Sequence, residues 1–229
     1  MLSRSGLRRC PMTVSYLFYD IETTGLNRAF DQVLEFAAIR TDHHLDEIER
    51  HTISVKLRPD VIPSPQAILI NRIPASDLGD GSCEFEATPK IHRLMNEPGT
   101  VSLGYNTLGF DDEFLRFSFH RNLLPPYTHQ FKNGCRRMDL FPMAVLYWLY
   151  KREFIILPEI EGKPSIKLEH IGSANRLISG QSHEAMVDVA ATVELARRFY
   201  KKKKMWQYLE GYFDKETDAH RMQLSLIHI

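Results

Sequence analysis

Residues 16–25 read YLFYDIETTG, an apolar and aromatic-rich run that ends in two threonines and a glycine. This pattern predicts a buried central strand that enters a turn. Two further runs have the length and β-branched content of neighbouring strands, VLEFAAIR at 33–40 and IERHTISVKL at 48–57. The polar residues 42–47 between them are typical of a hairpin, so we expect a three-stranded antiparallel meander.

The rest of the chain alternates strands with helices. Four prolines between residues 58 and 82 predict an irregular connection there. Beyond it we expect strands at 101–105 and 138–139, and helices at 84–96, 110–122, 140–151, 168–175 and 184–202. A meander followed by alternating strands and helices predicts an α/β domain, in which helices flank a mixed sheet.

The composition excludes several classes of protein. Hydrophobic residues make up 43% and charged residues 25%, which argues against a disordered chain, a collagen or a coiled coil. The longest apolar stretch, 141–150, contains a proline and falls well short of the roughly 20 residues that span a bilayer. The 29 basic residues balance the 29 acidic ones, so attraction to a polyanion must come from local patches. Three cysteines without a CxxC pair fit neither a disulfide framework nor a zinc site, and indicate a reducing, cytoplasmic setting.

The two ends of the sequence carry separate expectations. Residues 1–14 hold three arginines and no acid, and we interpret them as a disordered leader or as the result of a start misplaced upstream of Met12, with an organelle transit segment as the alternative. We assign the main domain to 15–210 and treat 211–229 as a truncated tail. The last six residues, LSLIHI at 224–229, match the translation of a widely used sequencing-library adapter, so our hypothesis is that they are artificial.

Carboxylates stand where two of the predicted strands end. Asp20 and Glu22 are two residues apart, so the pleat directs both to one face, near the carboxyl edge where sites form in α/β sheets. Taken alone, such a pair is more often a solvated turn. Asp111 follows the fourth strand, where it could simply cap a helix. Asp112 and Glu113 crowd the same turn, and a cation would relieve the repulsion among the three acids.

The last predicted helix carries one more acid beside its apolar stripe. A helical wheel centred on Val189 places Asp188 between Leu195 and Phe199. Because an unpaired buried carboxylate costs several kcal/mol, we expect a partner, either an arginine from elsewhere in the fold or, as we favour, a metal ion. His183 precedes this helix; such a histidine is usually surface decoration, but near four acids it could take a proton from water.

These residues form a recognisable set of motifs. Asp20-x-Glu22, Asn106-xxx-Phe110-Asp111 and His183-xxxx-Asp188 resemble, in order and spacing, the three exonuclease motifs of the DEDD superfamily, histidine subclass. The resemblance extends over roughly residues 16–210 and is greatest to the bacterial exonuclease I family, in the following stretches: FAAIRTD (36–42), GYNTLGFDDEFLRFSFHRN (104–122), PSIKLEHIGSANRL (164–177) and SHEAMVDVAAT (182–192).

The resemblance implies a ribonuclease H-like fold and removal of nucleotides from the 3′ end of single-stranded DNA by two-metal hydrolysis. It implies that Asp20 bridges two Mg²⁺ ions, for which Mn²⁺ may substitute, while Glu22 and Asp188 hold the ion that carries the nucleophilic water. Asp111 would serve the other ion and His183 would be the general base. The hard carboxylate oxygens suit Mg²⁺ or Mn²⁺ better than zinc.

Substrate contacts are expected mainly in the loop that follows residue 122. The loop interleaves aromatic with basic residues, a mixture that stacks bases and attracts phosphates, although loop aromatics are often only lids on a core. The resemblance implies strand contacts in this region and at the family's phosphate-binding position, where this chain has lysine in place of arginine. The candidate substrate-binding residues, besides Glu22, are Tyr127, Phe131, Arg116, Arg137 and Lys167.

The resemblance also carries expectations about partners. Exonuclease I has an SH3-like region and a helical region beyond its catalytic domain, and through them a single-stranded DNA-binding protein is a possible partner. We expect a monomer that does not contact membranes. The alternatives are an RNA-trimming or proofreading exonuclease of the same superfamily, and a catalytically silent nucleic-acid-binding module.

Overall fold

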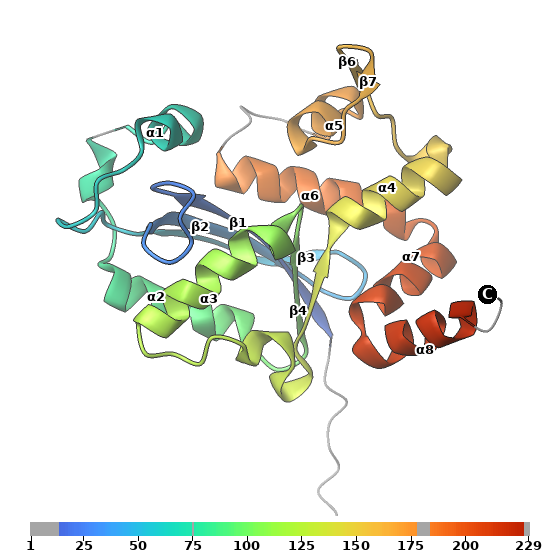
Figure 1. Ribbon diagram of the computed structural model, residues 1–229, viewed down its shortest axis with the longest axis horizontal. Helices are drawn as coiled ribbons and strands as arrows, with labels where there is room; N and C mark the ends of the chain where they lie inside the picture. Colours follow the sequence, from blue (N-terminus) through green and yellow to red (C-terminus); the bar gives the residue numbers. More distant parts are fainter. Residues whose placement is uncertain (1–13, 75, 178–183, 227–229) are drawn as a thin grey trace, which may run out of the picture.

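A mixed five-stranded sheet forms the centre of the protein, and helices cover both of its faces (Figure 1). The structure is a computed structural model that describes residues 14–74, 76–177 and 184–226. The strand order is β3-β2-β1-β4-β5, in which β1, β2 and β3 pair antiparallel while β4 and β5 extend the sheet parallel to β1. The strands are β1 (Ser15–Thr23), β2 (Val33–Thr41), β3 (Glu47–Ser54), β4 (Thr100–Gly104) and β5 (Arg136–Asp139).

Strand β1 is central because its sequence is apolar on both faces. Leu17, Tyr19 and Ile21 belong to the core on one side of the sheet, whereas Tyr16 and Phe18 belong to the core on the other side. Since side chains alternate along a strand, Asp20 and Glu22 share the face of Tyr16 and Phe18. The pleat of β1 therefore decides which helices the two carboxylates meet.

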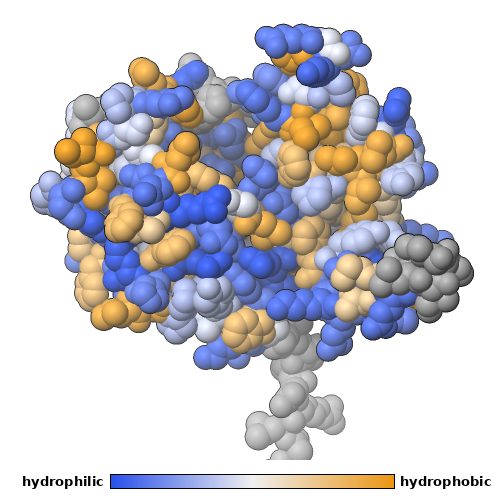
Figure 2. All heavy atoms as spheres, viewed as in Figure 1, coloured by the Kyte–Doolittle hydropathy of each residue, from blue (hydrophilic) through white to orange (hydrophobic). Residues whose placement is uncertain are grey.

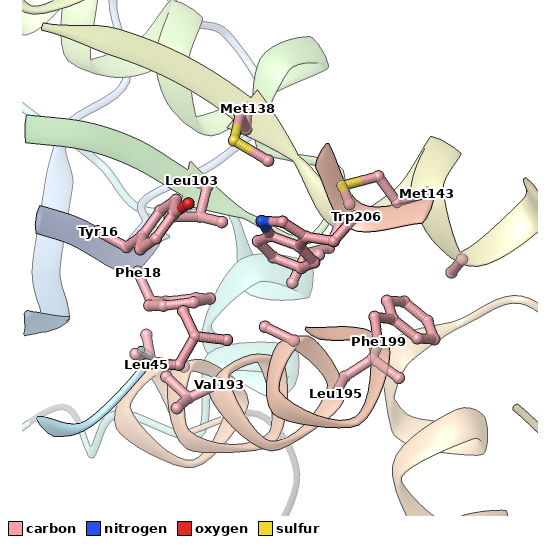
Figure 3. Close-up of a cluster of buried hydrophobic side chains, with 14 of the residues drawn as sticks. Tyr16, Phe18, Leu45, Leu103, Met138, Met143, Val193, Leu195, Phe199 and Trp206 are labelled. Carbon is pink, nitrogen blue, oxygen red and sulfur yellow. The ribbon is translucent and has the colours of Figure 1, made fainter. Parts of the chain in front are cut away.

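Two helices cover the face of Leu17, and a larger set covers the face of Phe18 (Figure 1). The first pair is α2 (Glu84–Met95) and α3 (Asp111–Arg121). The second set is α4 (Leu140–Tyr150), α5 (Leu168–Ala174), α6 (Ala185–Tyr200) and α7 (Lys203–Glu210). Figure 3 shows the core of the second face, where Tyr16 and Phe18 of the sheet meet Val193 of α6 and Trp206 of α7. The longest helix, α6, packs directly on β1 and β2.

The sequence predicted the five strands and the helices α2 to α6 with boundaries that differ by a few residues, but it did not predict the helices that follow α6, which are α7 and a further helix near the end of the chain. The largest difference among the strands is at β3, which ends at Ser54 rather than at residue 57 because Lys56 and Leu57 leave the sheet to pair with Ser82 and Leu78. The irregular connection 58–82 also contains a helix, α1 (Pro65–Asn71), and its proline stands at the first helical position, where the missing N–H is no loss.

Several short elements complete the chain. A helix α8 (Lys215–Leu226) follows α7, and a two-stranded ribbon joins β6 (Glu159–Ile160) to β7 (Lys163–Pro164). The 3-10 turns are η1 (Asp77–Gly79), η2 (Thr107–Gly109), η3 (Thr128–Gln130), η4 (Lys132–Gly134), η5 (Arg152–Phe154) and η6 (Gly211–Phe213). Among the helices in the described ranges, none combines the length and the apolar character that a membrane span requires. The predicted leader, apart from Val14, lies outside the described residues.

Candidate active site

Asp20 and Glu22 stand near the carboxyl end of β1, as the sequence predicted. Both side chains are half-buried, and both lie on the face of the sheet that α6 covers. The turn that follows is held in place locally, because Thr23 Oγ1 donates to the carbonyl of Gly25 over 2.8 Å and Thr24 Oγ1 donates to Asp31 over 3.2 Å. The two carboxylates therefore project from a strand end that is followed by a hydrogen-bonded turn.

Asp111 reaches the same strand from the first turn of α3. Its carboxylate oxygen Oδ1 accepts a hydrogen bond of 3.3 Å from the backbone N–H of Ile21, the residue between Asp20 and Glu22. The N-cap position belongs to Phe110, and no side-chain cap is present there. Asp111 therefore does more than cap its helix, because its buried carboxylate bonds to the backbone of β1 as well as to its own N–H in the first turn of α3.

Asp188 lies in the first turn of α6 and is half-buried. Leu195 and Phe199, its neighbours on the helical wheel, are fully buried, as is Val189 at the centre of the apolar stripe. Negative charge at Asp188 contributes to raising the pKa values of both Asp20 and Glu22. The fold thus brings together four acids that are up to 168 positions apart in the sequence.

The pKa values of these acids report their crowding. Burial, followed by repulsion from Asp111, Glu22 and Asp188, raises the pKa of Asp20 well above its usual 3.8. Burial and repulsion from Asp188 also raise the pKa of Glu22 to about 8. Burial raises the pKa of Asp111 to about 8 even though the Ile21 N–H favours its charged form. Neighbouring carboxylates in this state are favourable for binding a divalent cation, which would restore their charged forms.

A cleft opens beside Glu22. It has a volume of about 540 Å³ and is bounded by the ends of β1, β2 and β3, the α1–η1 segment and the start of α6. Glu35 of β2 pairs across the sheet with Glu22, and burial and repulsion from Glu184 raise its pKa. Figure 2 shows hydrophilic residues gathered across the middle of one face of the molecule. Sequence reasoning missed Glu35; a single acid within the run VLEFAAIR was the only signal.

The donor set suits a hard cation. Asp20, Glu22, Asp111 and Asp188 offer carboxylate oxygens only, the ligands that Mg²⁺ and Mn²⁺ prefer. Within the described ranges, no three His, Cys, Asp or Glu side chains are close enough as they stand to enclose a metal ion. Mg²⁺ usually keeps several waters and takes only one or two carboxylates from a protein, so the donor chemistry fits while the coordination would be completed by water. The predicted general base, His183, lies outside the described residues.

The three adjacent acids of α3 do not share a cation. Asp112 is fully buried and accepts hydrogen bonds from His129, Gln130 and Arg137, while Glu113 pairs with Arg116. Our expectation that a cation holds all three together is therefore wrong, because protein side chains neutralise two of them. Only Asp111 turns toward β1.

Asp139 is a further carboxylate that sequence reasoning left without a role. One of its oxygens accepts the N–H groups of Asn106 and Phe141, both over 2.8 Å, and the other accepts that of Leu108 over 3.2 Å. It thereby fixes the turn that leads from β4 to Asp111, and it also caps α4. Its position directly before a predicted helix could have indicated that Asp139 caps that helix.

The candidate substrate residues lie on separate surface segments. The guanidinium of Arg116 stacks 4.5 Å from the centre of the Tyr127 ring, and Nη2 donates to the Tyr127 hydroxyl over 2.7 Å. Tyr127 is 47% exposed and Phe131 69% exposed, so both rings are accessible to a base. Arg137 is partly engaged by Asp112. The Lys167 side chain is 71% exposed, with its ammonium 3.9 Å from Glu169, and it precedes α5.

The fold is that of a nuclease domain of the kind that hydrolyses nucleic acids from an end. The family model described as Exonuclease matches residues 17–196, and the chain belongs to this family. Enzymes of the family depend on a metal ion.

The relatives of the chain are bacterial. It is 38% identical to exodeoxyribonuclease I of Escherichia coli K12 over 186 residues, which cover 80% of this chain and 39% of that protein. It is 34% identical to exodeoxyribonuclease I of Haemophilus influenzae over 198 residues, covering 85% of this chain and 42% of the relative. The chain thus spans about two-fifths of the length of these relatives.

The fold comparison agrees with the sequence comparison. The crystal structure of E. coli exonuclease I in complex with a dA16 oligonucleotide superposes with a TM-score of 0.87 at 34% identity. The superposition covers 90% of this chain and 45% of the other. The predicted ribonuclease H-like fold, with its mixed sheet flanked by helices, is confirmed.

Proposed function

We propose that the chain is the catalytic domain of a metal-dependent 3′→5′ exonuclease that releases 5′-mononucleotides from single-stranded DNA. The observation that carries the proposal is the convergence of Asp20, Glu22, Asp111 and Asp188 at one strand end, in a chain related to exodeoxyribonuclease I. The domain corresponds to residues 15–210, and the match of the family model over 17–196 supports that extent.

The four acids are the proposed cation ligands. Repulsion from Asp111, Glu22 and Asp188 raises the pKa of Asp20, and Asp20 would hold two Mg²⁺ ions, with Mn²⁺ as a substitute. Two such ions supply charge to stabilise the entering and leaving oxygens of a phosphodiester. A zinc-ion-bound form of the E. coli exonuclease I–single-stranded DNA complex is known, which supports a divalent cation in this family.

The remaining residues bind the strand and move a proton. His183 would accept the proton of the attacking water, a task typically worth about 10²–10⁴ in rate. Tyr127 and Phe131 would stack on bases, while Arg116, Lys167 and the free edge of Arg137 would attract phosphates. Glu22 lines the cleft beside β1 and so would also contact the terminal nucleotide.

Single-stranded DNA is the proposed substrate because solved exonuclease I complexes contain dA16 and dT13 oligonucleotides. A structure that joins a single-stranded DNA-binding protein, SSB, with exonuclease I supports such a protein as a partner of the longer enzyme. We further propose a monomer that acts in the cytoplasm, in keeping with cysteines that form no disulfide among the described residues.

The test is digestion of a 5′-labelled single-stranded oligonucleotide with Mg²⁺, with EDTA, and with Mg²⁺ plus the Asp20→Ala variant. We expect a ladder that shortens from the 3′ end only in the first reaction. An equal ladder with EDTA or with the variant would contradict the proposal.

A proofreading exonuclease is the second candidate, because the chain is 33% identical over 116 residues to the PolC-type DNA polymerase III of Mycoplasma pneumoniae. Matched DNA and RNA strands, and a duplex with a mismatched 3′ end, separate the candidates. Preference for the mismatched end would favour proofreading, and faster digestion of RNA would favour trimming.

A further inference from the structure

A fully buried carboxylate lies next to the proposed cation ligand of α3. Oδ1 of Asp112 is 2.9 Å from His129 Nε2, and its Oδ2 accepts from Gln130 Nε2 over 3.1 Å and from Arg137 Nη1 over 2.7 Å. The side chains of Asp112 and His129 are both inaccessible to solvent. We call this group of four residues the Asp112 anchor.

All three donors come from the chain that follows α3. His129 and Gln130 belong to η3, which in the sequence stands between the exposed residues Tyr127 and Phe131, and Arg137 belongs to β5. The Asp112 anchor therefore joins the loop of residues 126–132, which we call the aromatic loop, to the first turn of α3. Helix α3 joins this loop a second time, through the stacking of Arg116 on Tyr127.

The same turn of α3 is also joined to the central strand. Asp111, the preceding residue, accepts the Ile21 N–H between Asp20 and Glu22. The backbone of residues 111–112 is thus held from two sides, by β1 through one carboxylate and by the aromatic loop through the other. Figure 1 shows α3 beginning close to the end of β4.

Small displacements at this turn would matter for a cation. A ligand that moves by about 1 Å loses much of its coordination, and residues that orient ligands typically change metal affinity about 10–100-fold when mutated. A buried carboxylate is tolerated only while its partners remain, so loss of one donor should shift the turn rather than leave it in place.

We propose that Asp112 is a positioning residue, which fixes the Asp111 carboxylate for cation binding and couples its placement to the loop that carries Tyr127 and Phe131. The inference rests on the proposed function for the identity of Asp111 as a ligand. Beyond that function, the inference predicts that residues that do not touch the cation, such as His129, affect how tightly the cation binds.

The test compares His129→Phe with the matched control His92→Phe. His129 packs its ring edge-on to Phe119 and leaves Nδ1 buried without a hydrogen-bond partner, so phenylalanine keeps the packing and removes an unsatisfied atom. His92 also packs edge-on to Phe119 and contacts the carbonyl of Pro125 and the hydroxyl of Thr128, but it makes no hydrogen bond to Asp112. Mn²⁺ affinity is measured by calorimetry without DNA, and folding by thermal unfolding.

We expect His129→Phe to weaken Mn²⁺ binding by roughly 3- to 10-fold, somewhat less than for groups that touch a ligand directly, and Asp112→Asn by roughly 10-fold or more. His92→Phe should bind Mn²⁺ as wild type does. Gln130→Ala removes a half-buried donor and should weaken Mn²⁺ binding by a smaller factor. This variant replaces the other two in the test if substitution of a fully buried residue prevents folding.

Unchanged Mn²⁺ affinity in the folded variants, an equal loss in His92→Phe, or no Mn²⁺ binding by wild type would overturn the inference. A wild-type protein that binds Mn²⁺ but leaves single-stranded DNA intact would refute the proposed function alone, since the Mn²⁺ affinities of the variants would still decide the role of Asp112.

Discussion

Replacing Glu22 by glutamine should stabilise the protein at alkaline pH when no divalent cation is present. Burial and repulsion from Asp188, Glu35 and Asp111 raise the pKa of Glu22 to about 8, against 4.5 for an ordinary glutamate. The folded state therefore holds a proton that the unfolded state releases between pH 4.5 and pH 8. Stability should fall as pH rises through that window and level off above pH 8.

The size of the effect follows from the same pKa difference. At about 1.36 kcal/mol per pH unit, a pKa of about 8 in place of 4.5 corresponds to roughly 5 kcal/mol at high pH. Coupling to the other acids and partial solvent exposure reduce this figure, and we expect a gain of about 1–3 kcal/mol for Glu22→Gln at pH 8.5. For a chain of 229 residues this corresponds to a rise in Tm of roughly 2–12 °C.

The assay is thermal unfolding followed by circular dichroism in EDTA, from pH 4 to pH 9. Glu86→Gln on the exposed side of α2 is the matched control and should follow wild type at every pH. Below pH 5 the Glu22→Gln and wild-type proteins should unfold at similar temperatures, and Mg²⁺ should reverse their order at pH 8.5 by stabilising wild type. Parallel Tm–pH curves for wild type and Glu22→Gln would refute the reasoning.

Four shorter predictions concern activity, binding and the core. Asp20→Ala should abolish Mg²⁺-dependent cleavage in a gel assay while the protein stays folded, and measurable wild-type turnover would contradict its central place among the ligands. Tyr127→Ala should weaken binding of a fluorescent single strand in Ca²⁺ by about 1–3 kcal/mol, as judged by anisotropy, and an unchanged Kd would remove the ring from the strand path. Lys167→Arg should lower KM a few-fold at constant kcat, because a guanidinium binds phosphate in a bidentate manner; a higher KM would argue against phosphate at this position. Phe199→Ala should cost about 3–5 kcal/mol in urea unfolding, since the buried ring stacks on Tyr147 at 4.0 Å between centroids, whereas a loss under 1 kcal/mol would show that the core closes around the gap.

Much of the fold could be predicted because its signals are local. The apolar run at 16–21, the hairpin residues 42–47 and the stripe around Val189 each follow the period of a strand or a helix. The same periods placed Asp20 and Glu22 on one face and set Asp188 beside buried side chains. The α1 helix was missed because the prolines around it indicated a loop, although a proline at a first helical position also starts helices.

The sequence by itself determined the strand pleat, the helix faces and the identity of the acids, because these depend on neighbours within one or two turns. Only the tertiary structure decided which partners each acid has. Asp111, Asp112 and Glu113 are adjacent acids in the sequence, yet their partners differ. Asp111 bonds to the Ile21 N–H, Asp112 to both His129 and Arg137, and Glu113 to Arg116. Glu35 faces Glu22 only through the register of β1 and β2. Such partners come from segments distant in the chain, and the packing of the whole core, rather than any local period, brings them within hydrogen-bonding distance.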